Sequence, residues 1–311
     1  MRPAASVLLL TTLTGFGYGL LAWVGAYAAL GLLSTKPWFA LGAIALALLL
    51  ASLGLIASTL HLGRRERAWR AFSQWRSSWL SREGVAAVLT YPVAIAFAAA
   101  VYRDGSGVAA RALGIAAAAA SLITVFCTSM IYASLKPIRQ WHNAHTAPDY
   151  LIYALFSGAV LLALLHAAVF GTPGAAAAAC VACAAVALIA KGLYWRHIDA
   201  QTPLATLASA IGLPKGTEAK PLDAPHFTEN YVLREMGFTI ARRHSAKLRR
   251  ISLVTGFAAP LGFSLIAGLS WLPRTATAAA LACAVVGLLA ERWLFFAEAT
   301  HVAALYYGRR I

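Results

Sequence analysis

Two ionisable side chains stand where long apolar segments end, and their types suit proton transfer. His61 follows one apolar segment and Glu83 precedes the next. An imidazole with an ordinary pKa of about 6.5 and a partly desolvated carboxyl group can each accept a proton. Oxidation of a quinol releases two electrons and two protons, and it needs acceptors of this kind. Simpler roles stay open, because His61 can cap a helix at the lipid headgroups and Glu83 can pair with Arg82 or favour a helix N-terminus.

The stretch between these two residues predicts an amphipathic helix over about 63–82. Its apolar positions are Ala68, Phe72, Trp75 and Trp79, and its polar ones include Arg67, Arg70, Gln74 and Arg76. Such a helix lies in the membrane interface with its aromatic rings at headgroup depth. It returns the chain to the same depth, so we expect His61 and Glu83 to face one pocket. Trp69, Trp75 and Trp79 are then available to flank a quinol ring, and Arg76 is a further candidate for binding it.

The elements that position these residues follow from composition. Of the 311 residues, 60% are hydrophobic and 12% are charged, whereas a soluble domain carries about 25% charged residues. Eight apolar stretches reach the length of about 20 residues that a helix needs to cross a bilayer. They cover roughly 5–33, 38–60, 84–102, 108–134, 150–170, 175–195, 251–271 and 275–297. Their continuous Ala/Leu runs lack two-residue alternation and favour helices over barrel strands.

The sequence therefore predicts an all-α integral membrane protein. Residues 1–311 form one domain of eight transmembrane helices, which can pack as two four-helix groups. The interfacial helix at about 63–82 and a loop at about 197–249 complete it, and a basic helix is expected from Asn230 to Arg250, running into the seventh span.

Basic residues indicate how the chain is oriented. The net charge is +15, from 26 Lys and Arg against 11 Asp and Glu. These residues fall between the apolar segments, which indicates topology and contact with anionic lipid rather than nucleic-acid binding. Most lie on the side that carries both termini and the long loop. The other side carries Lys36, Arg103, Arg111 and Arg274. We expect the termini to be cytoplasmic.

Polar groups inside the apolar segments are few. Glu291 and Glu298 are expected to form ion pairs with another helix, and Lys191 is expected to extend toward the membrane surface. The glycine-rich run 15–19 lies in an apolar segment and predicts close helix packing rather than phosphate binding.

We expect no metal or haem in this chain. Bis-histidine haem ligation would need paired mid-span histidines, and His166 has no convincing partner. Cys180 and Cys183 form a C-x-x-C in an alanine-rich span without the further ligands that zinc or an iron–sulfur cluster requires.

Several motifs resemble the membrane anchor subunit family of dimethyl sulfoxide reductase, and the likeness extends over the whole chain. The most specific match joins Ser58–Gly63 to Arg67–Gly84. Others are the opening from Arg2 to Gly15, Leu233–Phe238 with Ala241–His244, and Arg292–Glu298 with His301. The family's functional histidine falls on His61 and its functional glutamate on Glu83.

The resemblance implies an eight-span subunit that binds and oxidises menaquinol in the bacterial cytoplasmic membrane. Electrons would pass to an iron–sulfur subunit and then to a molybdopterin catalytic subunit during anaerobic respiration. The anchor would supply the quinol half-reaction of a larger oxidoreductase. Two alternatives remain, a transporter or channel and a purely structural anchor. A transporter predicts charged residues at the bilayer midplane, and the spans carry few.

Overall fold

A computed structural model describes residues 4–33, 36–60, 64–202, 205–214, 216–220, 222, 240–269 and 272–307. Within these ranges the regular elements are helices, and no strand occurs. Among the described residues, eight helices are long and apolar enough to cross a membrane. The prediction of an all-α integral membrane protein is confirmed.

The spans follow the predicted order. The first six are α1 (Ala5–Ala29), α2 (Pro37–Thr59), α3 (Trp79–Asp104), α4 (Val108–Ala133), α5 (Thr146–Phe170) and α6 (Ala175–Asp199). In the seventh, α9 (Ile240–Leu253) continues through a π-helical turn η2 (Val254–Ala258) into α10 (Ala259–Leu269), and α11 (Pro273–Ala297) is the eighth. Several helices are longer than the apolar runs that predict them, because a helix can continue from the hydrocarbon core into the headgroup layer.

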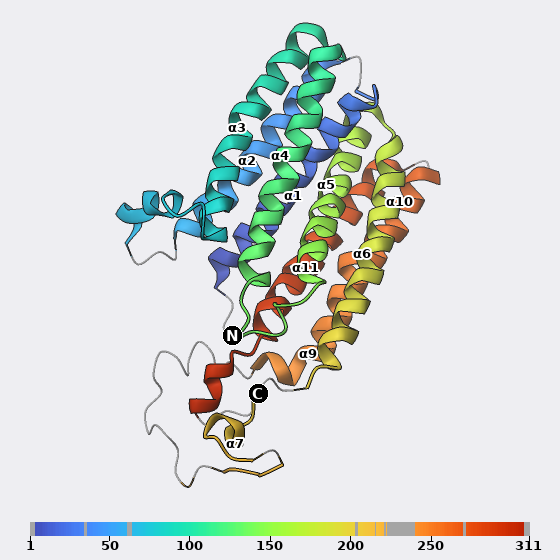
Figure 1. The fold of residues 1–311 in the computed structure, drawn as a ribbon. Coiled ribbons are helices and arrows are strands. Elements are labelled where there is room, and N and C mark those ends of the chain that lie inside the picture. The colour runs from blue at the N-terminus through green and yellow to red at the C-terminus, as the bar shows by residue number, and fades with distance from the viewer. Residues whose placement is uncertain are drawn as a thin grey trace.

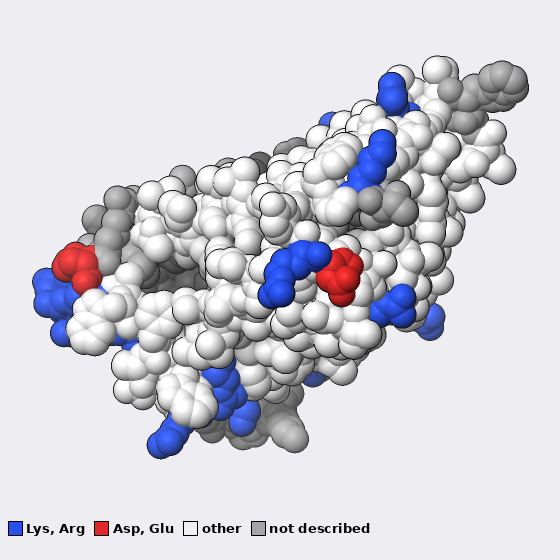
Figure 2. Space-filling view, turned by 90° about the horizontal axis from the view of Figure 1, so that it is seen from above, with Lys and Arg blue, Asp and Glu red and all other residues white. Residues whose placement is uncertain are grey.

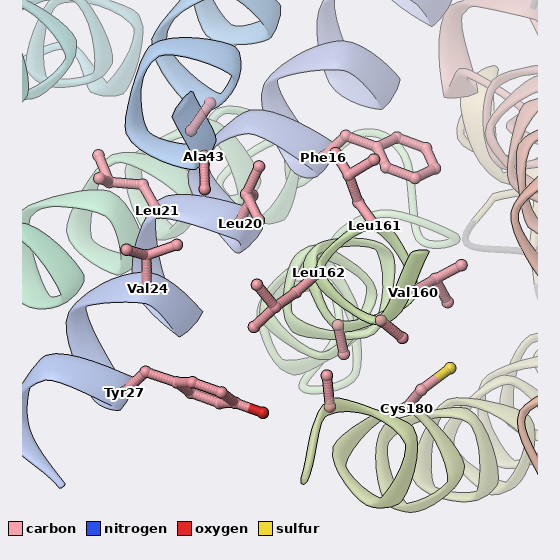
Figure 3. Close-up of a cluster of buried hydrophobic side chains, with 14 of the residues drawn as sticks. Phe16, Leu20, Leu21, Val24, Tyr27, Ala43, Val160, Leu161, Leu162 and Cys180 are labelled. Carbon is pink, nitrogen blue, oxygen red and sulfur yellow. The ribbon is translucent and has the colours of Figure 1, made fainter. Parts of the chain in front are cut away.

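The spans pack as two four-helix groups, as the sequence suggests. In the first group α1 packs on α2 and α4, and α3 packs on both α2 and α4. In the second group α5 and α10 each pack on α6 and α11. The two groups meet mainly where α1 and α4 lie against α5 (Figure 1). Side chains of α1, α2, α5 and α6 share one apolar core (Figure 3).

Small residues let α1 approach three neighbours closely. A side-chain carbon at Gly17 would meet the backbone of α2 at Ala47, and one at Gly19 would meet the α5 backbone at Ala154. Gly25 lies equally close to Gly114 of α4. Glycines in membrane helices permit such backbone contact and its dispersion energy. The predicted packing role of the glycine-rich run is confirmed at Gly17 and Gly19.

The predicted continuous helix over 63–82 is wrong. Its described part is a short 3-10 helix η1 (Arg65–Phe72), followed by turns, and α3 already begins at Trp79. Serine hydroxyls compete for backbone partners and favour helix ends. Ser73 donates to the Arg70 carbonyl, and Ser78 is extended as the residue before α3. The segment projects sideways from the bundle beside α3 (Figure 1).

The long segment after α6 is only partly described. It contains the four-residue helix α7 (Leu207–Ala210), and α9 is described from Ile240. The first ten residues of the predicted helix Asn230–Arg250 lie outside the described residues. From Ile240 onward a basic helix does run into the seventh span. A last 3-10 helix, η3 (Val302–Tyr307), follows α11.

The two ends of the bundle differ in charge. The start of α1 and the helix η3, the first and last described elements, lie at one end, which we call the termini end (Figure 1). At the opposite end the described basic residues are Lys36, Arg103, Arg111 and Arg274. Uncharged side chains cover most of that face (Figure 2). The folded protein thus keeps the charge asymmetry seen in the sequence.

Candidate functional site

Glu83 lies on the face of α3 that packs against the rest of the bundle. Buried residues recur along α3 at the spacing of one helix face, through Glu83, Ala87, Thr90 and Ala94. Glu83 is 6% exposed, and its Oε1 accepts a 2.6 Å hydrogen bond from the Thr128 hydroxyl on α4. A buried carboxylate needs such a donor, because its removal from water is otherwise costly.

Hydroxyl groups continue from Glu83 into the contact between α3 and α4. Thr128 lies one turn beyond Thr124, whose hydroxyl is 3.1 Å from that of Thr90 on α3. Tyr18 of α1 lies near enough to interact electrostatically with Glu83. The carboxyl group therefore belongs to a polar seam inside a bundle that is otherwise apolar.

Arg82 joins the start of α3 to the segment before it. Its guanidinium donates to the Trp75 carbonyl at 3.0 Å and to the Arg76 carbonyl at 2.6 Å, and it lies 4.2 Å from the centre of the Trp79 ring. The Trp79 ring meets Phe126 of α4 edge to face. Arg82 is thus occupied by this segment, and the alternative in which it pairs with Glu83 is not the arrangement observed.

Three further candidates for the quinol site, Trp75, Trp79 and Arg76, stand close to Glu83 along the chain, and their side chains differ in exposure. Trp79 is partly buried against α4, whereas the side chains of Trp75 and Arg76 are exposed. Trp75 and Arg76 contact the start of α3 through their backbone carbonyls. Of the three, Trp79 has the side chain best placed to border a site at Glu83.

His61 lies outside the described residues. The last described residue before it is Leu60, which follows the end of α2. Its pairing with Glu83 stays a prediction.

A small cavity lies between the two four-helix groups, and Thr128, which donates to Glu83 of α3, is part of its lining. Its volume is about 20 Å³, room for one or two water molecules. Residues of α1, α4, α5 and α11 line it, and most of them are polar. The polar ones are Thr11, Thr12, Thr14, Thr128, Tyr150, Tyr153, Ser157 and Arg292.

Four ionisable side chains gather beside this cavity in the second group. Glu291 of α11 forms a 2.5 Å ion pair with Lys191 of α6 and a 2.6 Å ion pair with its neighbour Arg292. The Lys191 and Glu291 side chains are each 1% exposed. Asp149 of α5 is also buried, and Lys191, Glu291 and Arg292 all act on it electrostatically. We call Asp149, Lys191, Glu291 and Arg292 the charge cluster.

The charge cluster corrects one prediction and confirms another. Lys191 does not extend toward the membrane surface, because Glu291 binds its ammonium group inside the bundle. The predicted ion pairs of Glu291 and Glu298 with other helices are present. Glu298 accepts a 2.7 Å hydrogen bond from Arg249 of α9.

Sequence reasoning did not single out Thr128 or the threonines of α1. The sequence pattern that could have pointed to them is a set of hydroxyl residues at helical spacing inside apolar runs. Ser121, Thr124 and Thr128 on α4 are all buried on one face. Isolated hydroxyls are common in membrane helices, so this spacing alone does not identify a partner.

Within the described part of the chain, no three His, Cys, Asp or Glu residues lie close enough together to hold a metal ion.

Comparison with known proteins gives two matches. A family model described as DMSO reductase anchor subunit (DmsC) matches residues 34–296. The chain is also 34% identical over 328 aligned positions to a sulfite dehydrogenase subunit from Allochromatium vinosum, an alignment that covers 99% of each protein.

Proposed function

The chain belongs to the DMSO reductase anchor subunit family, and from this premise we propose that it oxidises a quinol, with Glu83 and His61 as proton acceptors. Membership makes it a membrane anchor subunit of a molybdoenzyme family. The quinol step is the finer assignment, and menaquinol is the quinol we propose.

The burial of Glu83 is the observation that carries this proposal. A carboxyl group inside a membrane bundle is costly, and such groups by default serve a function. The Thr128 hydroxyl donates to Glu83 at 2.6 Å and so stabilises the ionised form. A carboxylate held in this way can accept a proton and return to its ionised form.

The reaction divides between this chain and its partners. Glu83 accepts one proton of the quinol, and His61 accepts the other. Trp79 borders the ring, with Trp75 and Arg76 on the exposed side of the same segment. The two electrons leave to an iron–sulfur subunit docked on this chain, and from there reach a molybdopterin catalytic subunit.

The basic termini end is the proposed docking face. Arg64, Arg67 and Arg70 are exposed there, close to the start of α3. We place the chain in a bacterial cytoplasmic membrane. The excess of basic residues at the termini end favours the cytoplasmic side for that end.

The relative from Allochromatium vinosum, a sulfite dehydrogenase subunit, favours a second possibility, in which electrons flow in the opposite direction. A dehydrogenase withdraws electrons from its substrate, so an anchor serving one would receive electrons and reduce a quinone. Glu83 and His61 would then donate the two protons. The same residues serve both directions, and the redox partner decides between them.

The test is Glu83→Gln in the full chain with its partner subunits. Glutamine keeps the size of the side chain and cannot exchange a proton at neutral pH. Loss of a general base lowers rates by about 100-fold to 10,000-fold, so we expect quinol-dependent reduction of the iron–sulfur clusters to fall by at least about 100-fold. Chemical reduction of the clusters and assembly of the complex should be unchanged.

Glu218→Gln is the matched control, because Glu218 is exposed outside the spans. Wild-type quinol oxidation in Glu83→Gln would refute the proposal and leave the structural anchor or the transporter. Mixing the reduced complex with a quinone, and the oxidised complex with a quinol, identifies the direction that runs faster.

A further inference from the structure

Polar atoms without hydrogen-bond partners gather around the cavity between the two groups. They are the hydroxyls of Thr12, Tyr150 and Tyr153 and the Nη1 atom of Arg292. All four residues are buried. Buried polar groups in native proteins are almost always satisfied by protein or by ordered water. The Tyr150 hydroxyl also interacts with Arg292, and the Tyr153 hydroxyl with Asp149. A hydroxyl can form more than one hydrogen bond, so polar groups of this kind around one space favour a polar occupant.

The size of the cavity limits what that occupant can be. A volume of about 20 Å³ suits one or two water molecules and is too small for a quinone ring. A bound water molecule usually makes about three hydrogen bonds. The cavity lining offers more polar groups than this, on four different helices.

Two residues of the cavity lining interact with carboxyl groups that lie outside it, Thr128 with Glu83 and Tyr153 with Asp149. On the α4 side its wall includes Thr128, whose hydroxyl donates to Glu83. On the α5 side its wall includes Tyr150 and Tyr153. Asp149 directly precedes Tyr150 and lies four residues before Tyr153, which puts Asp149 and Tyr153 on one face of α5. Asp149 lies in the first turn of α5, which begins at the termini end.

We propose that water in this cavity relays protons between Glu83 and Asp149. The proposal rests on the proposed function, because it supplies a route for the proton that Glu83 takes from the quinol. Asp149 is then the group that exchanges this proton with the termini end.

The relay conserves protons at each step and moves no electrons. Protonated Glu83 gives its proton to the Thr128 oxygen, while the Thr128 hydroxyl proton passes to the cavity water. The water passes a proton to the Tyr153 oxygen, and the Tyr153 hydroxyl proton passes to Asp149. Glu83 ends as a carboxylate that accepts from Thr128, which is the hydrogen bond observed. With quinone reduction the same steps run in reverse.

Arg292 is a positioning residue in this scheme. A guanidinium only donates hydrogen bonds, so its Nη1 atom binds a lone pair of the water and leaves the water protons free to point elsewhere. The guanidinium is itself fixed by Glu291 and lies 4.1 Å from the centre of the Tyr150 ring. It therefore orients the water without taking the proton.

The test measures steady-state quinol oxidation by the full complex in H2O and D2O. Asp149→Asn should lower the rate at least about tenfold, leave the KM for quinol unchanged and increase the solvent isotope effect. Asp149→Glu should restore most of the rate. Asp104→Asn, the same substitution at an exposed residue of the opposite end, should change nothing.

Asp149→Asn leaves the charge cluster with an unbalanced positive charge, so this variant can fail to assemble. Tyr153→Phe then decides, because it removes one hydroxyl and keeps the ring. We expect the same lower rate and larger isotope effect. A wild-type rate in an assembled Asp149→Asn or in Tyr153→Phe overturns the relay, and so does a rate loss with a raised KM.

Glu83→Gln separates the two proposals. If Glu83→Gln is inactive while Asp149→Asn and Tyr153→Phe are normal, the relay is wrong and the quinol assignment stands. If Glu83→Gln is active, the quinol assignment fails and the relay fails with it.

Discussion

Glu291→Gln should destabilise the protein more than Lys191→Met, although the two side chains form one ion pair. Glu291 contacts two cations, Lys191 at 2.5 Å and Arg292 at 2.6 Å. Its removal leaves both without their contact partner in the interior. Loss of one partner from a buried ion pair costs about 3–5 kcal/mol, and Arg292 cannot shed its charge because a guanidinium stays protonated.

Lys191→Met removes only one of these contacts. Glu291 keeps its ion pair with Arg292. The loss is that of one hydrogen bond to a charged group, about 1.5–3 kcal/mol. Adding Lys191→Met to Glu291→Gln should then recover stability, because it removes one of the two unpaired cations.

Reversible unfolding by SDS in mixed micelles, followed by loss of helical circular dichroism, measures these free energies. Glu218→Gln is the control and should stay within about 0.5 kcal/mol of wild type, as exposed substitutions do. The reasoning is refuted if Glu291→Gln and Lys191→Met cost the same, or if the double variant is as unstable as the sum of the two single ones.

Two further predictions concern helix contacts and pH. Gly19→Ala should lower the free energy of unfolding by about 1–3 kcal/mol, as overpacking does, because the added carbon meets the α5 backbone. Gly42→Ala, where space is open, should be neutral or stabilising in the same unfolding assay. Equal free energies for the two variants would contradict this packing. His145, just before α5, has a pKa below its usual 6.5 because of burial and the neighbouring His197, so the unfolded chain binds more protons there than the folded one. Stability should therefore fall as pH drops through 6.5 and level off below the lowered folded pKa. Melting temperatures measured between pH 5 and 8 test this. If His145→Gln leaves the dependence of melting temperature on pH unchanged, His145 is not its source.

Much of the architecture is determined by the sequence alone. Eight apolar runs of sufficient length predict eight spans, because the bilayer thickness and the need for internal backbone hydrogen bonds leave little choice. Ionisable groups in such runs stand out because they are rare, so Glu83, Lys191 and Glu291 are visible as candidates before any contact is known. The course of residues 64–78 is less predictable. Their amphipathic spacing is compatible with an interfacial helix, and equally with a 3-10 turn followed by an α3 that begins before the predicted third span.

Tertiary structure decided which polar groups meet. Thr128 is 45 residues from Glu83, and Lys191 is 100 residues from Glu291. The cavity needs four helices from both groups to enclose it. Helical periodicity gives the face on which a side chain lies, but the partner depends on how the helices pack, and that packing is set by many small contacts such as those at Gly17, Gly19 and Gly25. The residue types therefore predicted a proton-transfer chemistry, and only the packed bundle shows which hydroxyls and which small cavity lie beside Glu83 and the charge cluster.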